Sequence, residues 1–144
     1  MGFNVTVDVS GPVFDGRAEA AAHAFAHHVE EELGDLGVTM IRAYLPTQYQ
    51  YLSNPASLGF HGNRNHFIPG YYQSVIHKLD AGDSVLIHDT PCVYGPWLEG
   101  VGSRNATTRF KGYHTFRVIA QLLQGIAVEV AYSELPPYIE EMNA

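Results

Sequence analysis

The chain has 144 residues, a net charge of −7 and 46% hydrophobic residues. This length suits a single domain over residues 1–144 with a core of its own, and the hydrophobic content excludes an intrinsically disordered chain. The acidic balance argues against a protein that wraps nucleic acid, which needs many cations on phosphates. There is no apolar run of about 20 residues and no basic leader, so we expect no membrane contact, no secretory signal and folding in a cytoplasm.

The first predicted elements are a strand and a long helix. Apolar and polar residues alternate over 3–9, which predicts a half-buried strand. A helix is predicted over about 16–45, with Pro46 as its stop. Gly34 and Gly37 do not interrupt its period, so we expect one helix that bends near them. The residues of its expected core face recur at spacings of three and four: Ala22, Phe25, Val29, Leu33, Leu36, Met40 and Tyr44.

The middle of the chain is predicted to hold a long loop and a hairpin. Residues 46–70 show no period but include several aromatic side chains, so we expect a loop ordered by a neighbouring molecule or folded back on its own domain. Strand-like alternation at 71–79, a turn signal at 80–83 and a second strand-like run at 84–89 predict an antiparallel hairpin. Residues 93–94 are a candidate for a further short edge.

A second long loop, at about 95–113, leads to a closing helix. Apolar residues at helical spacing predict that helix over about 114–134: Phe116, Ile119, Ala120, Leu123, Ile126, Ala127 and Val130. The competing interpretation is a strand at 126–132, where apolar residues also alternate, and Pro136–Pro137 is expected to interrupt the helix. The predicted fold class is α+β: a small antiparallel sheet, made of the N-terminal strand and the central hairpin, packed against a long N-terminal helix and a C-terminal helix.

The 95–113 loop is where we expect the function of the chain. A plain connection needs roughly 2–6 residues, whereas the stretch 94–117 holds the only tryptophan and four of the eight Lys and Arg residues. Trp, Tyr, Phe and Arg dominate buried contacts between proteins. The predicted interface residues are Trp97, Glu99, Arg104, Asn105, Arg109, Phe110, Lys111 and Tyr113. Acidic residues gather elsewhere, at 30–35 and near the C-terminus, so copies of the chain are expected to bind head to tail.

Enzymatic motifs such as G-x-S-x-G, the P-loop and the Rossmann fingerprint are absent from the sequence, so neither catalytic residues nor a cofactor is predicted. His23 and His27 lie four apart without a matching third ligand, so no metal site is predicted. Glu99 is expected to form a structural ion pair near Arg104. Cys92 is expected to be a small buried hydrophobe. A small metal- or ligand-binding enzyme that uses the histidines and Glu99 is the alternative from a different class.

Two blocks carry a resemblance to a known family. The segment 93–117 resembles the signature of small structural proteins from tailed bacteriophages of actinobacteria. More distantly, it resembles the tail-completion or head–tail joining family, which has a Tyr-x-x-x-(Val/Leu)-Glu-x-Gly block after a hairpin. The matching residues here are Tyr94, Leu98, Glu99 and Gly100, with Gly102 near the usual glycine.

The earlier block, 70–76, resembles the family's Thr-Gly-x-Leu-x-x-Ser-Ile block, with Pro69 in place of Thr and Tyr72 in place of Leu. The matched order of elements covers about residues 16–130. The insertion at 101–113 departs from the general family pattern, although not from the actinobacterial phage version.

The resemblance implies an α+β subunit that assembles as a homo-oligomeric ring, with a hexamer as the expected form, at the head–tail junction of a siphovirus-type virion. It implies no catalytic residues. The expected partners are the chain itself and the neighbouring neck or connector and tail-tube proteins, while DNA passes through the channel without specific binding. The protein would be made in the host cytoplasm and end in the virion. The alternatives within the same class are a tail terminator or another neck ring protein.

Overall fold

The computed structural model describes residues 11–13, 15–48, 71–82, 84–90 and 92–143. Two long helices, three short helices and one hairpin make up these residues: α1 (Arg17–Gln48), α2 (Tyr71–Ser74), β1 (His77–Asp80), β2 (Val85–His88), α3 (Gly95–Glu99), α4 (Ser103–Thr107) and α5 (Thr115–Asn143). The α+β class is confirmed, with a long N-terminal helix, a C-terminal helix and an antiparallel hairpin packed together. The predicted strand at 3–9 and most of the predicted 46–70 loop lie outside the described residues.

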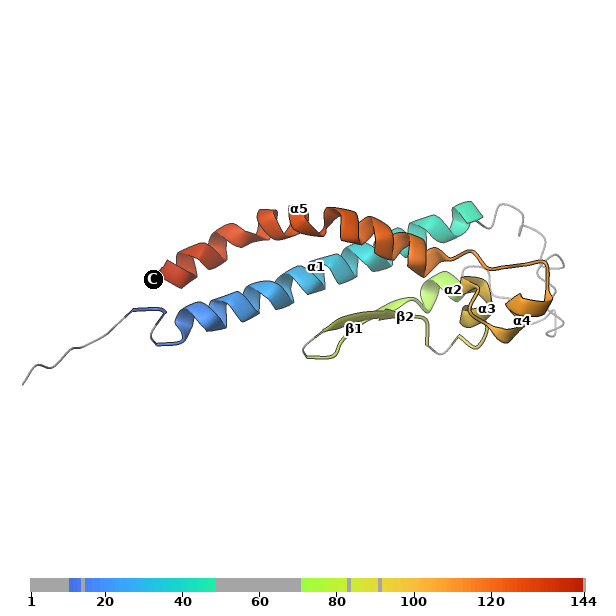
Figure 1. Cartoon of the computed structure of the whole chain (residues 1–144), viewed down its shortest axis with the longest axis horizontal. Coiled ribbons are helices and arrows are strands. Elements are labelled where there is room, and N and C mark those ends of the chain that lie inside the picture. The colour runs from blue at the N-terminus through green and yellow to red at the C-terminus, as the bar shows by residue number, and fades with distance from the viewer. Residues whose placement is uncertain (1–10, 14, 49–70, 83, 91, 144) are drawn as a thin grey trace, which may run out of the picture.

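Helix α1 is the middle layer of an elongated molecule. Helix α5 runs antiparallel along one side of α1, and the hairpin lies along another side (Figure 1). Two glycines of α1 permit this close approach. A Cβ atom at Gly34 would lie 2.7 Å from the side chain of Val85, and one at Gly37 would overlap Ile87 and lie 3.0 Å from Leu123 of α5. Gly34 and Gly37 are therefore packing positions, where any side chain would push a neighbouring element away.

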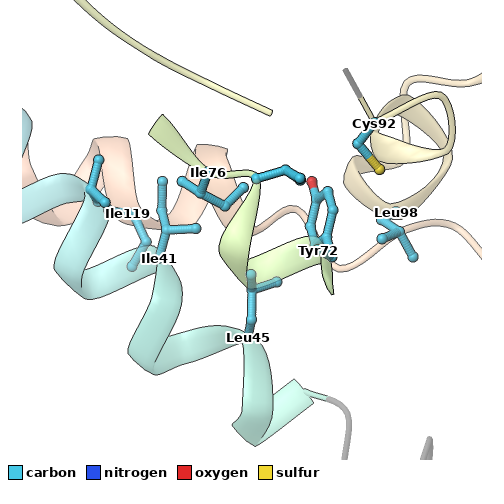
Figure 2. Close-up of a cluster of buried hydrophobic side chains, with 9 residues drawn as sticks. Ile41, Leu45, Tyr72, Ile76, Cys92, Leu98 and Ile119 are labelled. Carbon is cyan, nitrogen blue, oxygen red and sulfur yellow. The ribbon is translucent and has the colours of Figure 1, made fainter. Parts of the chain in front are cut away.

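The hydrophobic core lies towards one end of the molecule, where α2 and α3 meet the C-terminal half of α1. Figure 2 shows this cluster. Its buried members come from four helices and the segments beside them: Val38, Ile41, Leu45, Tyr72, Val75, Ile76, Cys92, Leu98 and Ile119. The prediction that Cys92 is a buried hydrophobe is confirmed. The face predicted for α1 is only half-buried, and its first residue, Ala22, is exposed. The buried apolar residues of α1 in the core, Val38, Ile41 and Leu45, are not on the predicted face, because α5 covers one side of α1 and the hairpin and α2 cover another.

Helix α1 does not stop at Pro46, as the sequence predicted, but continues to Gln48. Proline lacks the N–H that would bond the carbonyl four residues earlier, that of Arg42. The side-chain amide of Gln73 donates to this carbonyl instead, at 2.8 Å, and the Arg42 guanidinium donates to the Ile76 carbonyl at 2.7 Å. Contacts from the α2 region thus replace the missing helical hydrogen bond.

The predicted hairpin is confirmed but is shorter than expected. Its register places His77 opposite His88 and Asp80 opposite Val85. The strand prediction for 71–76 is wrong, because this segment begins with α2 and buries residues 72, 75 and 76, which is helical spacing. Residues 93–94 form a turn and no edge strand.

The helical interpretation of 126–132 is confirmed, since α5 runs without a break from Thr115 to Asn143. The prediction that Pro136–Pro137 would interrupt it is wrong. Contacts with α1 flank the proline pair: Glu134 lies 3.0 Å from the His28 ring nitrogen, and the Tyr138 ring centroid lies 5.5 Å from that of Phe25. This packing stabilises the last turns of α5 although two backbone donors are missing.

Candidate interaction site

The predicted functional loop folds into a compact unit at one end of the molecule (Figure 1). We call residues 95–114 the tip. The sequence predicted a long loop here, but the tip contains two short helices, α3 and α4. Pro96 begins α3, and Gly100 ends it in the left-handed conformation, with φ of 91°. The N–H of Gly100 donates to the carbonyls of Pro96 at 3.1 Å and Trp97 at 3.2 Å, so the end of α3 is hydrogen-bonded.

The returning chain crosses α3 at backbone contact distance. The N–H of Tyr113 donates to the Leu98 carbonyl at 2.7 Å. A Cβ atom at Gly112 would overlap the backbone of Gly100, and one at Gly100 would overlap the Lys111 carbonyl oxygen. Both glycines also have positive φ, 91° and 98°. Only glycine at both positions allows this crossing, so the glycines fix the shape of the tip.

Asn105 holds the tip together from within. It is 4% exposed. Its side-chain oxygen accepts the N–H of Gly102 at 3.0 Å, and its side-chain nitrogen donates to the carbonyls of Trp97 at 3.0 Å and Phe110 at 3.2 Å. The amide of Asn105 therefore joins the backbone at Gly102, Trp97 and Phe110. The structure gives this predicted interface residue an internal role.

Three aromatic side chains of the tip pack against one another. The ring centroids of Trp97 and Phe110 are 4.6 Å apart, and those of Phe110 and Tyr113 are 4.9 Å apart with an edge-on geometry. All three side chains are half-buried, and Trp97 and Tyr113 also pack against the core. Burial raises the pKa of the Tyr113 phenol above its ordinary value. The aromatic residues thus anchor the tip and present only part of their surface to solvent.

Glu99 connects the tip to α5. Its two carboxylate oxygens accept the backbone N–H groups of Phe116 at 3.0 Å and Arg117 at 3.1 Å. These donors have no partner within a helix, and a negative charge there is stabilised by the helix dipole. The predicted ion pair of Glu99 near Arg104 is not among the interactions of the described residues; the carboxylate caps a helix instead.

The cations of the tip divide into two kinds. The Lys111 ammonium donates to the carbonyls of Asn105 at 2.8 Å and Ala106 at 3.5 Å, where it neutralises the end of α4. Arg104 and Arg109 are exposed, and within the described part of the chain neither guanidinium has an ion-pair partner. Lys111 is exposed as well, but its ammonium is engaged by the carbonyls of Asn105 and Ala106, so Arg104 and Arg109 are the two tip cations best placed to pair with another molecule.

Acidic side chains lie away from the tip. Of the acidic cluster at 30–35, in the middle of α1, Glu30 and Glu32 are exposed, whereas Asp35 is already paired with Lys78 at 2.6 Å. That hydrogen bond raises the pKa of Lys78. The C-terminal Glu140 and Glu141 are exposed on the last turns of α5, at the end of the molecule opposite the tip. The molecule is therefore basic at the tip and acidic both at the middle of α1 and at the end opposite the tip.

His23 and His27 lie apart from Glu99, whereas the ring of His114 lies beside Gly100, the residue that follows Glu99. A shallow hollow of about 400 Å³ between α1 and the hairpin turn is lined by His23, Ala26, His27, Glu30 and Gly82. The ring of His27 lies 3.4 Å from the Asp80 carboxylate. Glu99 is at the tip, with both oxygens engaged by α5. Among the described residues, no three His, Cys, Asp or Glu side chains are grouped to hold a metal ion.

Sequence reasoning missed two contributors to the tip. Gly112 was not predicted to cross Gly100, because nothing in a sequence pattern shows which glycines meet. His114 was not among the predicted interface residues. It has a positive φ of 53° and its carbonyl accepts the first helical hydrogen bond of α5, from Val118 at 2.9 Å. In the sequence, His114 stands directly after Gly112-Tyr113 and before the apolar helical period. This position could have indicated that His114 precedes the first turn of the helix.

Comparisons of the chain with protein-family models, with curated proteins and with solved structures find no match. Within the described residues, α5 is the one helix whose length and composition would suffice to cross a membrane, and few residues of its most apolar stretch are fully buried inside the molecule. The expectation of no membrane contact stays a prediction. The class that fold and site define is therefore an α+β protein with a rigid basic tip and an exposed apolar helix.

Proposed function

We propose that the chain is a structural subunit of a tailed-bacteriophage virion that forms a ring at the head–tail junction and leaves a channel for DNA. The observation that supports an assembly role is the construction of the tip. Its backbone is fixed by Asn105 and by the Gly100–Gly112 crossing, while Arg104 and Arg109 remain exposed on it. A rigid surface with exposed arginines suits a protein contact, because little side-chain and loop entropy is lost on binding.

The placement in a phage tail rests on the sequence blocks described above. Three residues of the Tyr94–Gly100 block have structural roles in the fold. Leu98 is 4% exposed in the core, Glu99 caps α5, and Gly100 ends α3. Because these residues shape the tip, proteins with the same tip would share the block. The block therefore does not tell one neck or tail ring from another. A tail terminator or another neck ring is the alternative assignment within this class.

In the proposed ring, Arg104 and Arg109 dock on an acidic surface of the next subunit. The candidates are Glu30 with Glu32, exposed in the middle of α1, and the pair Glu140 with Glu141, exposed on the last turns of α5. A contact between unlike surfaces of neighbouring copies is heterologous, which is the kind that closes rings. The net charge of −7 also suits a channel wall along which DNA must slide.

The test is the assembly state of the full chain, alone and mixed with the tail-tube protein of its own virion. Native mass spectrometry and electron microscopy should show rings, or binding to tube ends, for the wild type. The variant Arg104→Glu with Arg109→Glu should stay folded and fail to assemble, whereas Gln121→Glu with Gln124→Glu, which adds two carboxylates at exposed positions of α5, should assemble. Normal rings from the double variant would overturn the tip contact. A wild type indifferent to the tube protein would overturn the function.

A further inference from the structure

The hollow between α1 and the hairpin turn brings together side chains that are far apart in the sequence. It has a volume of about 400 Å³ and is lined by His23, Ala26, His27, Glu30 and Gly82. His23 and His27 are four residues apart on α1, so their side chains lie on one side of the helix. In the sequence, this pair had no matching third ligand. The hairpin supplies one, because its turn places Asp80 beside His27.

The distance between His27 and Asp80 suits two ligands of one metal ion. The Nε2 atom of His27 lies 3.4 Å from the Asp80 carboxylate. Two ligand atoms bound to a tetrahedral Zn²⁺ at about 2.0–2.1 Å are themselves about 3.4 Å apart. The Gly82 N–H donates to the same Asp80 oxygen at 2.8 Å, which fixes the carboxylate and lowers its pKa, so Asp80 is ionised at neutral pH. A metal ion bound to these two atoms therefore requires no movement of the backbone.

A second carboxylate supports the His27 ring from its other nitrogen. The Nδ1 atom of His27 lies 4.0 Å from the Glu31 carboxylate, one turn further along α1 and within ion-pair distance. A carboxylate beside the non-ligating nitrogen commonly orients a metal-bound histidine, because it holds the proton on Nδ1 and leaves Nε2 to bind the ion. The His27 side chain is half-buried, so the orientation of its ring is restricted. Nε2 is therefore the nitrogen presented to Asp80.

His23 completes the set of ligands by a rotation of its side chain. Its Nε2 atom now lies 3.9 Å from the Glu19 carboxylate, and its side chain is 81% exposed, so little packing opposes the rotation. In the described part of the chain no three metal-binding side chains are already grouped, so the ion itself has to draw His23 in. Two histidines at positions i and i+4 of a helix are able to share one Zn²⁺. The exposed Glu30 at the same hollow adds negative charge that attracts a cation.

We propose that His23, His27 and Asp80 bind one Zn²⁺ ion, which joins the hairpin turn to α1. Two imidazoles and a carboxylate suit Zn²⁺ better than Mg²⁺ or Ca²⁺, which prefer oxygen ligands alone. Three protein ligands leave the fourth tetrahedral position to water. The ion would hold in place a two-stranded hairpin, which has little stability of its own. The site lies away from the tip (Figure 1), so it does not depend on the proposed function.

Calorimetric titration of the full chain with zinc chloride, after treatment with EDTA, tests the site. The wild type should bind one ion per chain with a dissociation constant in the micromolar range. His23→Ala, His27→Ala and Asp80→Asn should each raise that constant at least tenfold, because each removes one ligand. His77→Ala is the matched control. His77 stands opposite His88 on the same hairpin, so this variant removes one member of a facing histidine pair outside the site and should bind Zn²⁺ like the wild type. Circular dichroism verifies that each variant is folded.

Thermal denaturation gives a second readout. Excess Zn²⁺ should raise the thermal midpoint of the wild type and of His77→Ala, but not that of Asp80→Asn, because only binding to the folded chain stabilises it. Unchanged affinity in Asp80→Asn would show an ordinary pair of helix histidines and overturn the site. Loss of binding in His77→Ala would place the ion elsewhere and overturn it as well. So would displacement of Zn²⁺ by excess Mg²⁺, or a wild type that binds no Zn²⁺ at about 100 μM.

Discussion

Glu99 and Phe116 are joined by a 3.0 Å hydrogen bond from the Phe116 backbone N–H to the Glu99 carboxylate, across 17 residues of chain. Because the second oxygen accepts the N–H of Arg117, the last residue of α3 caps the start of α5. Together with the packing of Leu98 and Trp97 on the core, this carboxylate ties the tip to the long helix pair.

Removing this cap should loosen the tip from α5. Glu99→Ala leaves two helix N–H groups without their acceptor and should lower the free energy of unfolding by about 1–2 kcal/mol. Glu99→Gln keeps an acceptor but loses the charge, so we expect a smaller loss. Urea denaturation followed by circular dichroism measures both values. Glu129→Ala, which removes an exposed carboxylate from the middle of α5, is the matched control and should change stability little. Equal stability of Glu99→Ala and the wild type would contradict the capping role.

The Gly100–Gly112 crossing predicts a steric requirement. Alanine at Gly100 would combine a positive φ with overlap of the Lys111 carbonyl, so a loss of at least about 2 kcal/mol is expected. Gly82→Ala separates the two effects, since Gly82 has φ of 90° and nothing within 4 Å of its Cβ position. This control should show only the backbone cost, about 1 kcal/mol. A Gly100→Ala loss no larger than that of Gly82→Ala in the same thermal denaturation series would contradict the crossing.

Asn105 can be tested with the one tryptophan of the chain as a reporter. Asn105→Asp keeps the size of the side chain but replaces the donor of two hydrogen bonds by an acceptor, beside the carbonyls of Trp97 and Phe110. A buried group left without a donor costs about 1–3 kcal/mol, more where charge is involved. The fluorescence of Trp97 should shift to the red and its quenching by acrylamide should increase, while the circular dichroism of α1 and α5 remains. An unchanged Trp97 spectrum would show that the amide does not hold the tip.

Lys78 and Asp80 predict how the docking of the hairpin depends on pH. A hydrogen bond from the Gly82 N–H lowers the pKa of Asp80, with a further contribution from His27, and the hydrogen bond with Asp35 raises that of Lys78. The Asp80 contribution is therefore present above its ordinary pKa of 3.8 and lost as pH falls through the lowered value. The Lys78 contribution is present below 10.5 and lost as pH rises through the raised value.

The measurement is the thermal midpoint as a function of pH at low salt, because exposed pairs are screened. Asp35→Asn should remove part of the loss of stability at alkaline pH. Asp80→Asn should remove part of the loss at acid pH. If both variants show the wild-type profile on both limbs, the hairpin is held by its apolar contacts alone.

The sequence predicted the elements whose apolar period is long, and failed where the deciding contact is distant. The two long helices and the hairpin were predicted because their patterns repeat. Pro46 and the Pro136–Pro137 pair were misread as helix ends, since their cost is offset by Gln73 in one case and by packing on α1 in the other. Gln73 lies 31 residues after Arg42 in the sequence, and Phe25 lies far before Tyr138, so neither contact leaves a local signal.

The ambiguity at 126–132 had a physical origin. Ile126 and Val130 point towards α1, and Val128 and Tyr132 point away from it. The same alternation that imitates a strand therefore marks a helix with two apolar faces. In the tip, residue types singled out the segment as an interface, which stays a prediction, and they gave no means to separate Asn105, which is internal, from Arg104, which is exposed.

The antiparallel course of α1 and α5 has a practical consequence for imaging. Arg17 and Asn143 lie at the same end of the molecule, opposite the tip (Figure 1). A small fluorescent or electron-dense domain fused after residue 144 would thus mark the acidic end and leave Arg104 and Arg109 uncovered. In micrographs of any assembly that contains the protein, the radial position of that marker would give the direction in which each subunit points.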